Sequence, residues 1–95
     1  MAAPEIDVDA LAAMAQDVQV TAQDADGLVK ATAGPSGRID EIKVEAELAD
    51  GGAEAAAREI MHVLNEAQRL ADAEFNRRVQ EQITAFITRA KGGQA

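Results

Sequence analysis

Apolar and polar residues recur with different periods along the chain, and each period predicts an element. Over residues 5–16 the apolar positions fall three and four apart, which predicts a short helix. Residues 18–23 and 28–33 alternate between apolar and polar, as half-buried strands do, and Gly27 suits the turn between them. The first third of the chain therefore predicts one helix and two strands.

The remaining two thirds predict a third strand and one long helix. Residues 38–48 alternate again, and residues 50–52 (DGG) end that strand. From residue 53 to about residue 90 there is neither Pro nor Gly, so we expect a helix roughly 55 Å long. This order predicts an α+β fold, α-β-β-β-α with a three-stranded antiparallel meander, as a single domain over residues 1–91 with a disordered tail over 92–95. Apolar residues of the third strand are expected to share one buried face: Ile42, Val44, Ala46 and Leu48. Of these, we expect Ile42 and Val44 to seat the long helix together with Val29 and Ala31.

The segment GPSG, residues 34–37, has two interpretations. A phosphate-binding loop needs several backbone N–H groups aimed at one anion, usually with a helix immediately after it. Here a strand follows, and Pro35 removes one donor. We therefore expect a hairpin turn, of type I with Pro35 at its second position.

Composition favours an oligomer. The 95 residues include no cysteine, so no disulfide can staple the fold, and much of the 47% hydrophobic content is alanine. Strands of six to ten residues cover about 20–33 Å, roughly half of the long helix. Beyond the sheet we expect a bare apolar stripe, and bare apolar stripes mark interaction sites. We predict that this distal seam is the interface of a homodimer: Phe75, Val79, Ile83 and Phe86.

Charge is distributed unevenly along the chain. The formal net charge is −8, and residues 1–54 hold twelve acidic and three basic residues. From Phe75 onward four bases accompany a single acid, Glu81. These bases have two interpretations, a solvated outer helix face or contacts to phosphate groups: Arg77, Arg78, Arg89 and Lys91.

Catalytic and metal-binding classes find little support in the sequence. His62 is the only histidine, and no cysteine or nucleophile–base arrangement accompanies it, so we expect a solvated helix position. We predict no enzyme, no metal and no cofactor. The N-terminus lacks the charge pattern of a secretory signal, and no apolar run reaches ~18–20 residues, so we expect a cytoplasmic protein that does not enter the membrane.

Three short motifs occur in the order of the predicted elements: GLVKAT at residues 27–32, GRIDEIKV at 37–44 and LNEAQRLA at 64–71. Over about residues 18–79 this combination resembles the YbaB/EbfC family of bacterial nucleoid-associated proteins, in particular the divergent, alanine-rich members typical of high-GC, actinobacterial genomes. The resemblance implies α-β-β-β-α dimers whose helical arms project like tweezers and bind DNA with little sequence preference. It would place DNA contact on the arms, at Arg77, Arg78, Arg89 and Lys91.

Two functions follow as hypotheses. The first is a homodimeric, nucleoid-associated protein that binds duplex DNA weakly through basic helical arms. The second is a protein-interaction adaptor or chaperone-like factor, since some relatives lie beside specialised secretion systems. The acidic first 54 residues repel DNA and suit a basic protein partner.

Overall fold

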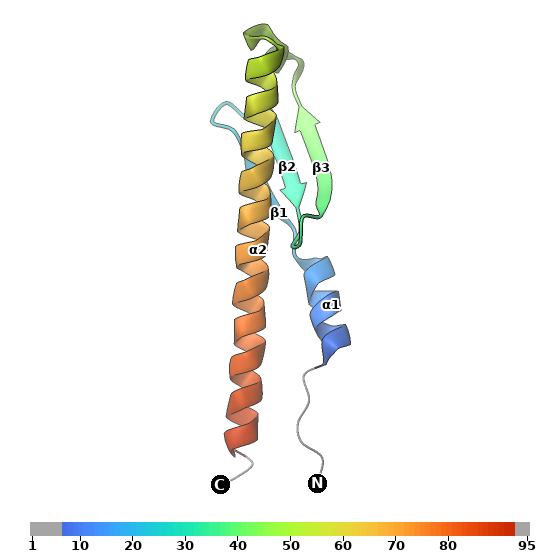
Figure 1. Cartoon of the computed structure of the whole chain (residues 1–95), viewed down its shortest axis with the longest axis vertical. Coiled ribbons are helices and arrows are strands. Elements are labelled where there is room, and N and C mark those ends of the chain that lie inside the picture. Colours follow the sequence, from blue (N-terminus) through green and yellow to red (C-terminus); the bar gives the residue numbers. More distant parts are fainter. Residues whose placement is uncertain (1–6, 93–95) are drawn as a thin grey trace.

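The computed structural model describes residues 7–92, and it is strongly elongated. Its extents are 66 × 20 × 16 Å and its radius of gyration is 19.0 Å, against about 12–13 Å for a compact domain of this length. No helix within residues 7–92 is long and apolar enough to cross a bilayer. The elements confirm the predicted order (Figure 1): α1 Val8–Asp17, β1 Val20–Gln23, β2 Val29–Ala33, β3 Ile39–Val44, a 3-10 helix η1 Ala46–Gly51, and α2 Ala53–Gly92.

The three strands form one antiparallel sheet in the order β1-β2-β3. Val20 pairs with Ala33 across β1 and β2, and on the other side of β2 Ala31 pairs with Ile42. A bulge interrupts the β2–β3 ladder between Thr32 and Ala33. The meander fold is thus confirmed. Of the tail predicted over residues 92–95, Gly92 is the last residue of α2, and residues 93–95 lie outside the described residues, as does the predicted start of the first helix at residues 5 and 6.

The core lies between one face of the sheet and the first half of α2. Side chains from β1 and β2 pack against α2 there, and Leu48, Ile60 and Leu70 close the margin. Alanine is the commonest residue in this core, so helix and sheet approach closely and bury little apolar area per residue. The buried apolar residues are Val18, Ala22, Val29, Ala31, Ala33, Val63, Leu64, Ala67 and Ala71.

The prediction for the third strand was wrong in two respects. The strand ends at Val44, and Ala46 and Leu48 belong to η1, so they do not continue its face. Ile42 and Val44 do lie on the same side of the sheet as their partners Ala31 and Val29, but both are exposed. The cause is the position of α2, which packs over β1 and β2 and leaves β3 beside it (Figure 1).

The GPSG segment is a hairpin turn, as predicted, but not of type I. Ser36 and Gly37 both have positive φ, 62° and 79°, and Arg38 N–H donates to the Pro35 carbonyl at 3.4 Å. Two successive left-handed residues are typical of the type I′ turn, whose twist matches that of the flanking strands. Asp72 on α2 holds this conformation, because its carboxylate accepts a hydrogen bond from Ser36 N–H at 2.9 Å.

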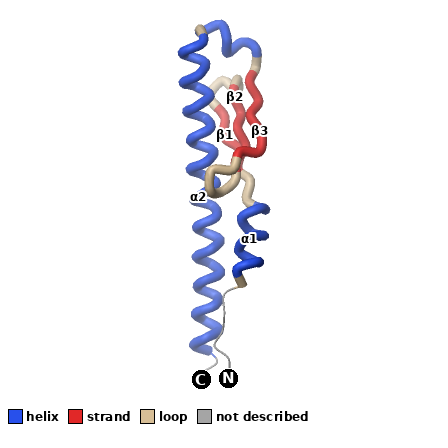
Figure 2. The backbone as a smooth tube through the Cα atoms, turned by 45° about the vertical axis from the view of Figure 1, so that its right-hand side comes forward, coloured by secondary structure: helices blue, strands red, loops and turns tan. Residues whose placement is uncertain are grey.

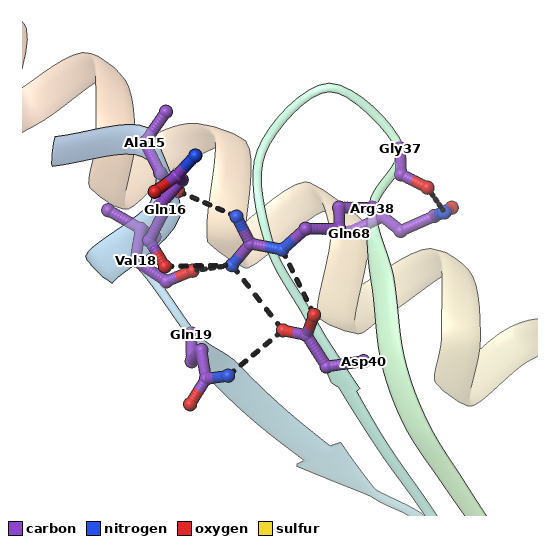
Figure 3. A network of polar contacts seen from close by, with 8 residues as sticks. All are labelled: Ala15, Gln16, Val18, Gln19, Gly37, Arg38, Asp40 and Gln68. Atoms are coloured by element: carbon purple, nitrogen blue, oxygen red, sulfur yellow. Dashed lines mark hydrogen bonds and ion pairs between the residues drawn. The ribbon is translucent and has the colours of Figure 1, made fainter. Parts of the chain in front are cut away.

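Arg38, which follows the turn, ties α1 to the sheet (Figure 3). Its guanidinium donates to the carbonyl oxygens of Ala15 at 2.9 Å and Val18 at 2.6 Å, at the C-terminal end of α1. Asp40 orients the same guanidinium from the side, with its carboxylate 3.0 Å from Nε. A cation at this position satisfies carbonyls that the helix leaves unpaired and complements the negative end of the helix dipole.

Gly34 makes room for this arrangement. A Cβ at residue 34 would lie 2.2 Å from the guanidinium carbon of Arg38, inside van der Waals contact. The first glycine of GPSG therefore serves packing against an arginine and not backbone flexibility. As a result α1 runs alongside the distal part of α2, on the same side as the sheet (Figures 1 and 2).

Candidate nucleic-acid interface

The predicted distal seam lies on the face of α2 that is turned toward α1. Phe75, Val79 and Phe86 are half-buried and Ile83 is 40% exposed. A cavity of about 430 Å³ separates the seam from α1, which contributes Leu11 and Met14 to its lining. The stripe is only partly covered: Ile83 is exposed, while α1, which the arginine tie directs along α2, lies across the cavity from Val79 and Phe86. Its role as a dimer interface stays a prediction.

The four bases of the distal helix divide into two pairs with different surroundings. Arg77 and Arg78 both bind the carboxylate of Glu74, at 2.7 Å and 2.9 Å, and Arg77 also pairs with Glu81. Two carboxylates thus balance two guanidinium groups within two turns of helix. The first pair presents no net positive charge to a phosphate.

The pKa of Glu74 reflects this pairing. Hydrogen bonds from Arg77, and next from Arg78, lower the Glu74 pKa from 4.5 to about 2. The same contact with Glu74 raises the pKa of Arg77. Both groups therefore stay ionised at any pH at which DNA binding is measured.

Arg89 and Lys91 form the second pair, in the last turn of α2. Both are exposed, and within residues 7–92 neither has a carboxylate within 4.0 Å. Arg89 lines the cavity between the helices together with Asp7, the N-cap residue of α1, so one acid lies near the basic tip. Net positive charge on the distal helix is concentrated at this tip.

Among the described residues, the other candidates do not come together as a catalytic or metal-binding site. His62 is exposed on α2, beside Arg58 and Asn65 in a shallow groove. In the described part of the chain no three His, Cys, Asp or Glu side chains are grouped so as to hold a metal ion. No charged or polar residue is buried there either.

A comparison with protein families decides the assignment. The family model described as the YbaB/EbfC DNA-binding family matches residues 5–86. The chain belongs to the YbaB/EbfC family. Comparisons with curated proteins and with solved structures gave no match.

Membership in the YbaB/EbfC family supports nucleoid-associated DNA binding as the general function. The matched range includes Arg77 and Arg78 and ends before Arg89 and Lys91. Sequence reasoning named all four bases but did not pair the first two with Glu74 and Glu81. The signal was present: Glu74 stands three and four residues before the arginines and Glu81 four residues after Arg77, the spacings at which helix side chains meet. Arg38 carried no comparable signal, since the helix-end carbonyls that it binds lie 23 and 20 residues away in sequence.

Proposed function

We propose that this YbaB/EbfC protein is a homodimer that binds duplex DNA weakly, with little sequence preference, through the distal part of α2, and that it acts at the nucleoid. The family match carries the proposal. From Phe75 to Lys91 the distal helix carries four basic residues against one acidic residue, which makes it the best candidate for phosphate contact.

Among the four basic residues, we assign the larger share of the DNA contact to Arg89 and Lys91. Their charges are not balanced by a carboxylate among the described residues, whereas Glu74 and Glu81 balance Arg77 and Arg78. Residues eleven apart complete about three helical turns, so Arg78 and Arg89 lie on the same side of α2. A duplex lying along that side would meet the tip first and Arg78 second.

Weak and sequence-tolerant binding follows from the kind of contact. Basic side chains at the tip of a helix reach phosphate groups, and contacts to phosphate groups carry no sequence information directly. Two protomers would supply about four contacts from Arg89 and Lys91, for a slope of log K against log salt of about −3 to −4. The acidic body, with a net charge of −9 over residues 1–54, opposes closer approach.

The test is a fluorescence-anisotropy titration of two duplexes of unrelated sequence at ~50 and ~200 mM salt. Both duplexes should bind similarly, and Arg89→Ala/Lys91→Ala should lose more affinity and more salt slope than Arg77→Ala/Arg78→Ala. Arg58→Ala, which removes an exposed base from the proximal part of α2, is the matched control and should bind as the unchanged protein does. Absence of binding at ~50 mM salt would refute the proposal.

A second candidate function is an adaptor for a basic protein. The observation in its favour is the acidic body together with the neutralised Arg77–Arg78 pair, which leaves little positive surface. Capture experiments in nuclease-treated lysate separate the two functions. A specific partner retained after nuclease treatment, combined with no DNA binding at low salt, would favour the adaptor.

A further inference from the structure

The N-terminal end of α1 lies beside the basic tip of α2. The two helices run antiparallel, so α1 begins near the C-terminal part of α2 (Figures 1 and 2). Asp7, the N-cap residue of α1, lines the same cavity as Arg89 of the tip. The base to which we assign much of the DNA contact therefore shares its surroundings with an acid of another helix.

The charges of α1 are all negative. Residues 7–17 contain three aspartates and no lysine or arginine, and Asp7 and Asp9 stand at the beginning of the helix. The Asp7 carboxylate accepts a hydrogen bond from Ala10 N–H at 3.1 Å. Because this bond fixes Asp7 to the first turn, its charge moves with the helix. Docked α1 thus brings two negative charges to the end of the molecule that carries the basic tip.

Arg89 is near these acids without being locked by them. Among residues 7–92 no carboxylate lies within 4.0 Å of its guanidinium, whereas Glu74 holds Arg78 at 2.9 Å. Arg89 therefore stays able to bind a phosphate, but that phosphate would have Asp7 across the same cavity. Repulsion between two anions extends over about 10 Å at 0.1 M salt. Docked α1 thus opposes the contact that Arg89 is proposed to make.

α1 also borders the side of α2 along which the duplex is proposed to lie. Residues four and seven apart lie along one side of a helix. Gln82 follows Arg78 by four residues and precedes Arg89 by seven, and both Gln82 and Arg89 line the cavity next to α1. DNA that contacts Arg78 and Arg89 together would therefore meet the acidic end of α1.

The way in which α1 is attached suits a displacement of its N-terminal end. α1 has no buried residue, and a cavity of about 430 Å³ separates it from α2. The hydrogen bonds from Arg38 end on the carbonyls of Ala15 and Val18, at the C-terminal end of α1, and Val18 is fully buried. Because the anchoring contacts gather at that end, the N-terminal end can turn away from α2 while the sheet stays intact.

We propose that α1 is an autoinhibitory element: while it is docked, its aspartates repel the phosphates that Arg89 would bind, and its displacement frees the tip. The proposal rests on DNA binding by the distal helix and adds the regulation of that same surface. Phosphates and the acidic end of α1 compete for the space beside Arg89. Docked α1 therefore gives weak DNA binding a second cause, besides the small number of basic residues.

The first test removes the two charges and keeps the helix. Asparagine caps a helix about as well as aspartate does, so Asp7→Asn/Asp9→Asn changes charge with little effect on α1. At ~50 mM salt this variant should bind duplex DNA about threefold more tightly, and the gain should shrink as salt screens the repulsion. In an Arg89→Ala background the same two changes should have little effect, since the contact that they relieve is gone. An unchanged affinity in the parent background would overturn the proposal.

The matched control removes two charges elsewhere. Asp17 is exposed at the other end of α1, ten residues and about 15 Å of helix from Asp7, and Glu47 is exposed in η1. Asp17→Asn/Glu47→Gln should therefore change DNA affinity much less than Asp7→Asn/Asp9→Asn. An equal gain would mean that net charge alone governs binding, and would overturn the proposal.

The second test releases α1 without changing any charge. A Cβ at residue 34 would lie 2.2 Å from the guanidinium carbon of Arg38, so Gly34→Ala should push that group away from the carbonyls of α1. Gly34 does not have a positive φ, so alanine fits its backbone. Hydrogen exchange should show α1 amides losing protection while those of β2 keep theirs, and DNA affinity should rise about threefold. Adding Asp7→Asn/Asp9→Asn to Gly34→Ala should give little further gain, and two fully independent gains would overturn the proposal.

The outcomes separate this proposal from the function beneath it. DNA binding by the unchanged protein, with no gain in either variant, would leave the function standing and overturn autoinhibition. A gain in both variants that disappears in Arg89→Ala would uphold both. No binding by any of these proteins at ~50 mM salt would refute the DNA-binding function, and autoinhibition with it.

Discussion

The sheet-bearing half and the α1-bearing half of the molecule are held together by different kinds of contact. In the first half, β1, β2 and α2 as far as Ala71 bury nearly all of the core, with alanine and valine in close contact. In the second half, α1 has no buried residue and neither has α2 beyond Ala71. There the contacts are ion pairs on the surface of α2 and the hydrogen bonds from Arg38 to the end of α1, and a cavity lies between α1 and α2. The comparison indicates a close-packed platform, formed by the sheet and α2 as far as Ala71, that carries a loosely packed arm, formed by α1 and α2 beyond Ala71.

Overfilling the core should give the largest effect and should be confined to the platform. Ala67 is fully buried between α2 and the sheet, so Ala67→Leu forces extra volume into a close-packed layer and should cost about 1–3 kcal/mol. The control is Ala85→Leu on the exposed face of the arm, with a change within about 0.5 kcal/mol. Urea denaturation measures both, and equal costs would contradict the division into two halves.

Removing the arginine tie should release the arm without unfolding the platform. Arg38→Ala deletes the charged donor to the end of α1, and we expect a cost of about 1–2 kcal/mol. Hydrogen exchange should show α1 amides losing protection while those of β2 keep theirs. Arg38→Lys keeps the charge but not the fork of donors, and should restore only part of the protection. Uniform loss across both elements would mean that α1 belongs to the platform.

Relieving the backbone strain at Ser36 in the turn should stabilise the platform by a smaller amount. Ser36 has φ 62°, a conformation that costs a residue with a side chain roughly 1 kcal/mol and costs glycine little. Ser36→Gly keeps the backbone N–H that donates to Asp72, so we expect a gain of about 0.5 kcal/mol, with part of the relief offset by the entropy of the unfolded chain. Ser36→Ala retains the strain and should not stabilise. Thermal unfolding of the three proteins distinguishes these outcomes.

Acidification should have the smallest effect of these changes, because the ion pairs of Glu74 in the arm persist to low pH. The lowered Glu74 pKa means that its pairing with Arg77 and Arg78 is fully present above the ordinary carboxyl pKa of 4.5 and is lost only as pH falls through about 2. A side-chain NMR titration of Glu74 should give that low midpoint. In Arg77→Ala/Arg78→Ala the midpoint should return towards 4.5. An ordinary midpoint in the unchanged protein would show that the arginines are unpaired, and would then favour them as phosphate contacts.

The periodicity of apolar residues was enough to predict the platform, because each strand and the long amphipathic helix can be recognised from the order of apolar and polar residues within its own segment. It failed at β3, where the alternation of Ile42 and Val44 was correct but the position of α2 leaves those residues uncovered. A sequence pattern reports which residues prefer burial and not which surface buries them. At β3 the same pattern coincides with an exposed apolar face.

The arm was harder to predict because its determinants are not local. That α1 lies over Val79 and Phe86 depends on Arg38 reaching carbonyl groups at the end of a helix, 23 and 20 residues away in sequence. The balance of Arg77 and Arg78 by Glu74 was readable from helix spacing, while the exposed tip at Arg89 and Lys91 was identified from composition alone. Candidate DNA contacts thus came from the sequence, and their relative weight came from the structure.

The contact between Gly34 and Arg38 has an evolutionary consequence. Any side chain at residue 34 would occupy the space of the guanidinium, so the glycine is constrained for as long as the arginine holds α1. The two positions should therefore change together among descendants of this chain. A lineage that loses Arg38 is released to lose Gly34 as well, and the pair would record whether its arm is still anchored.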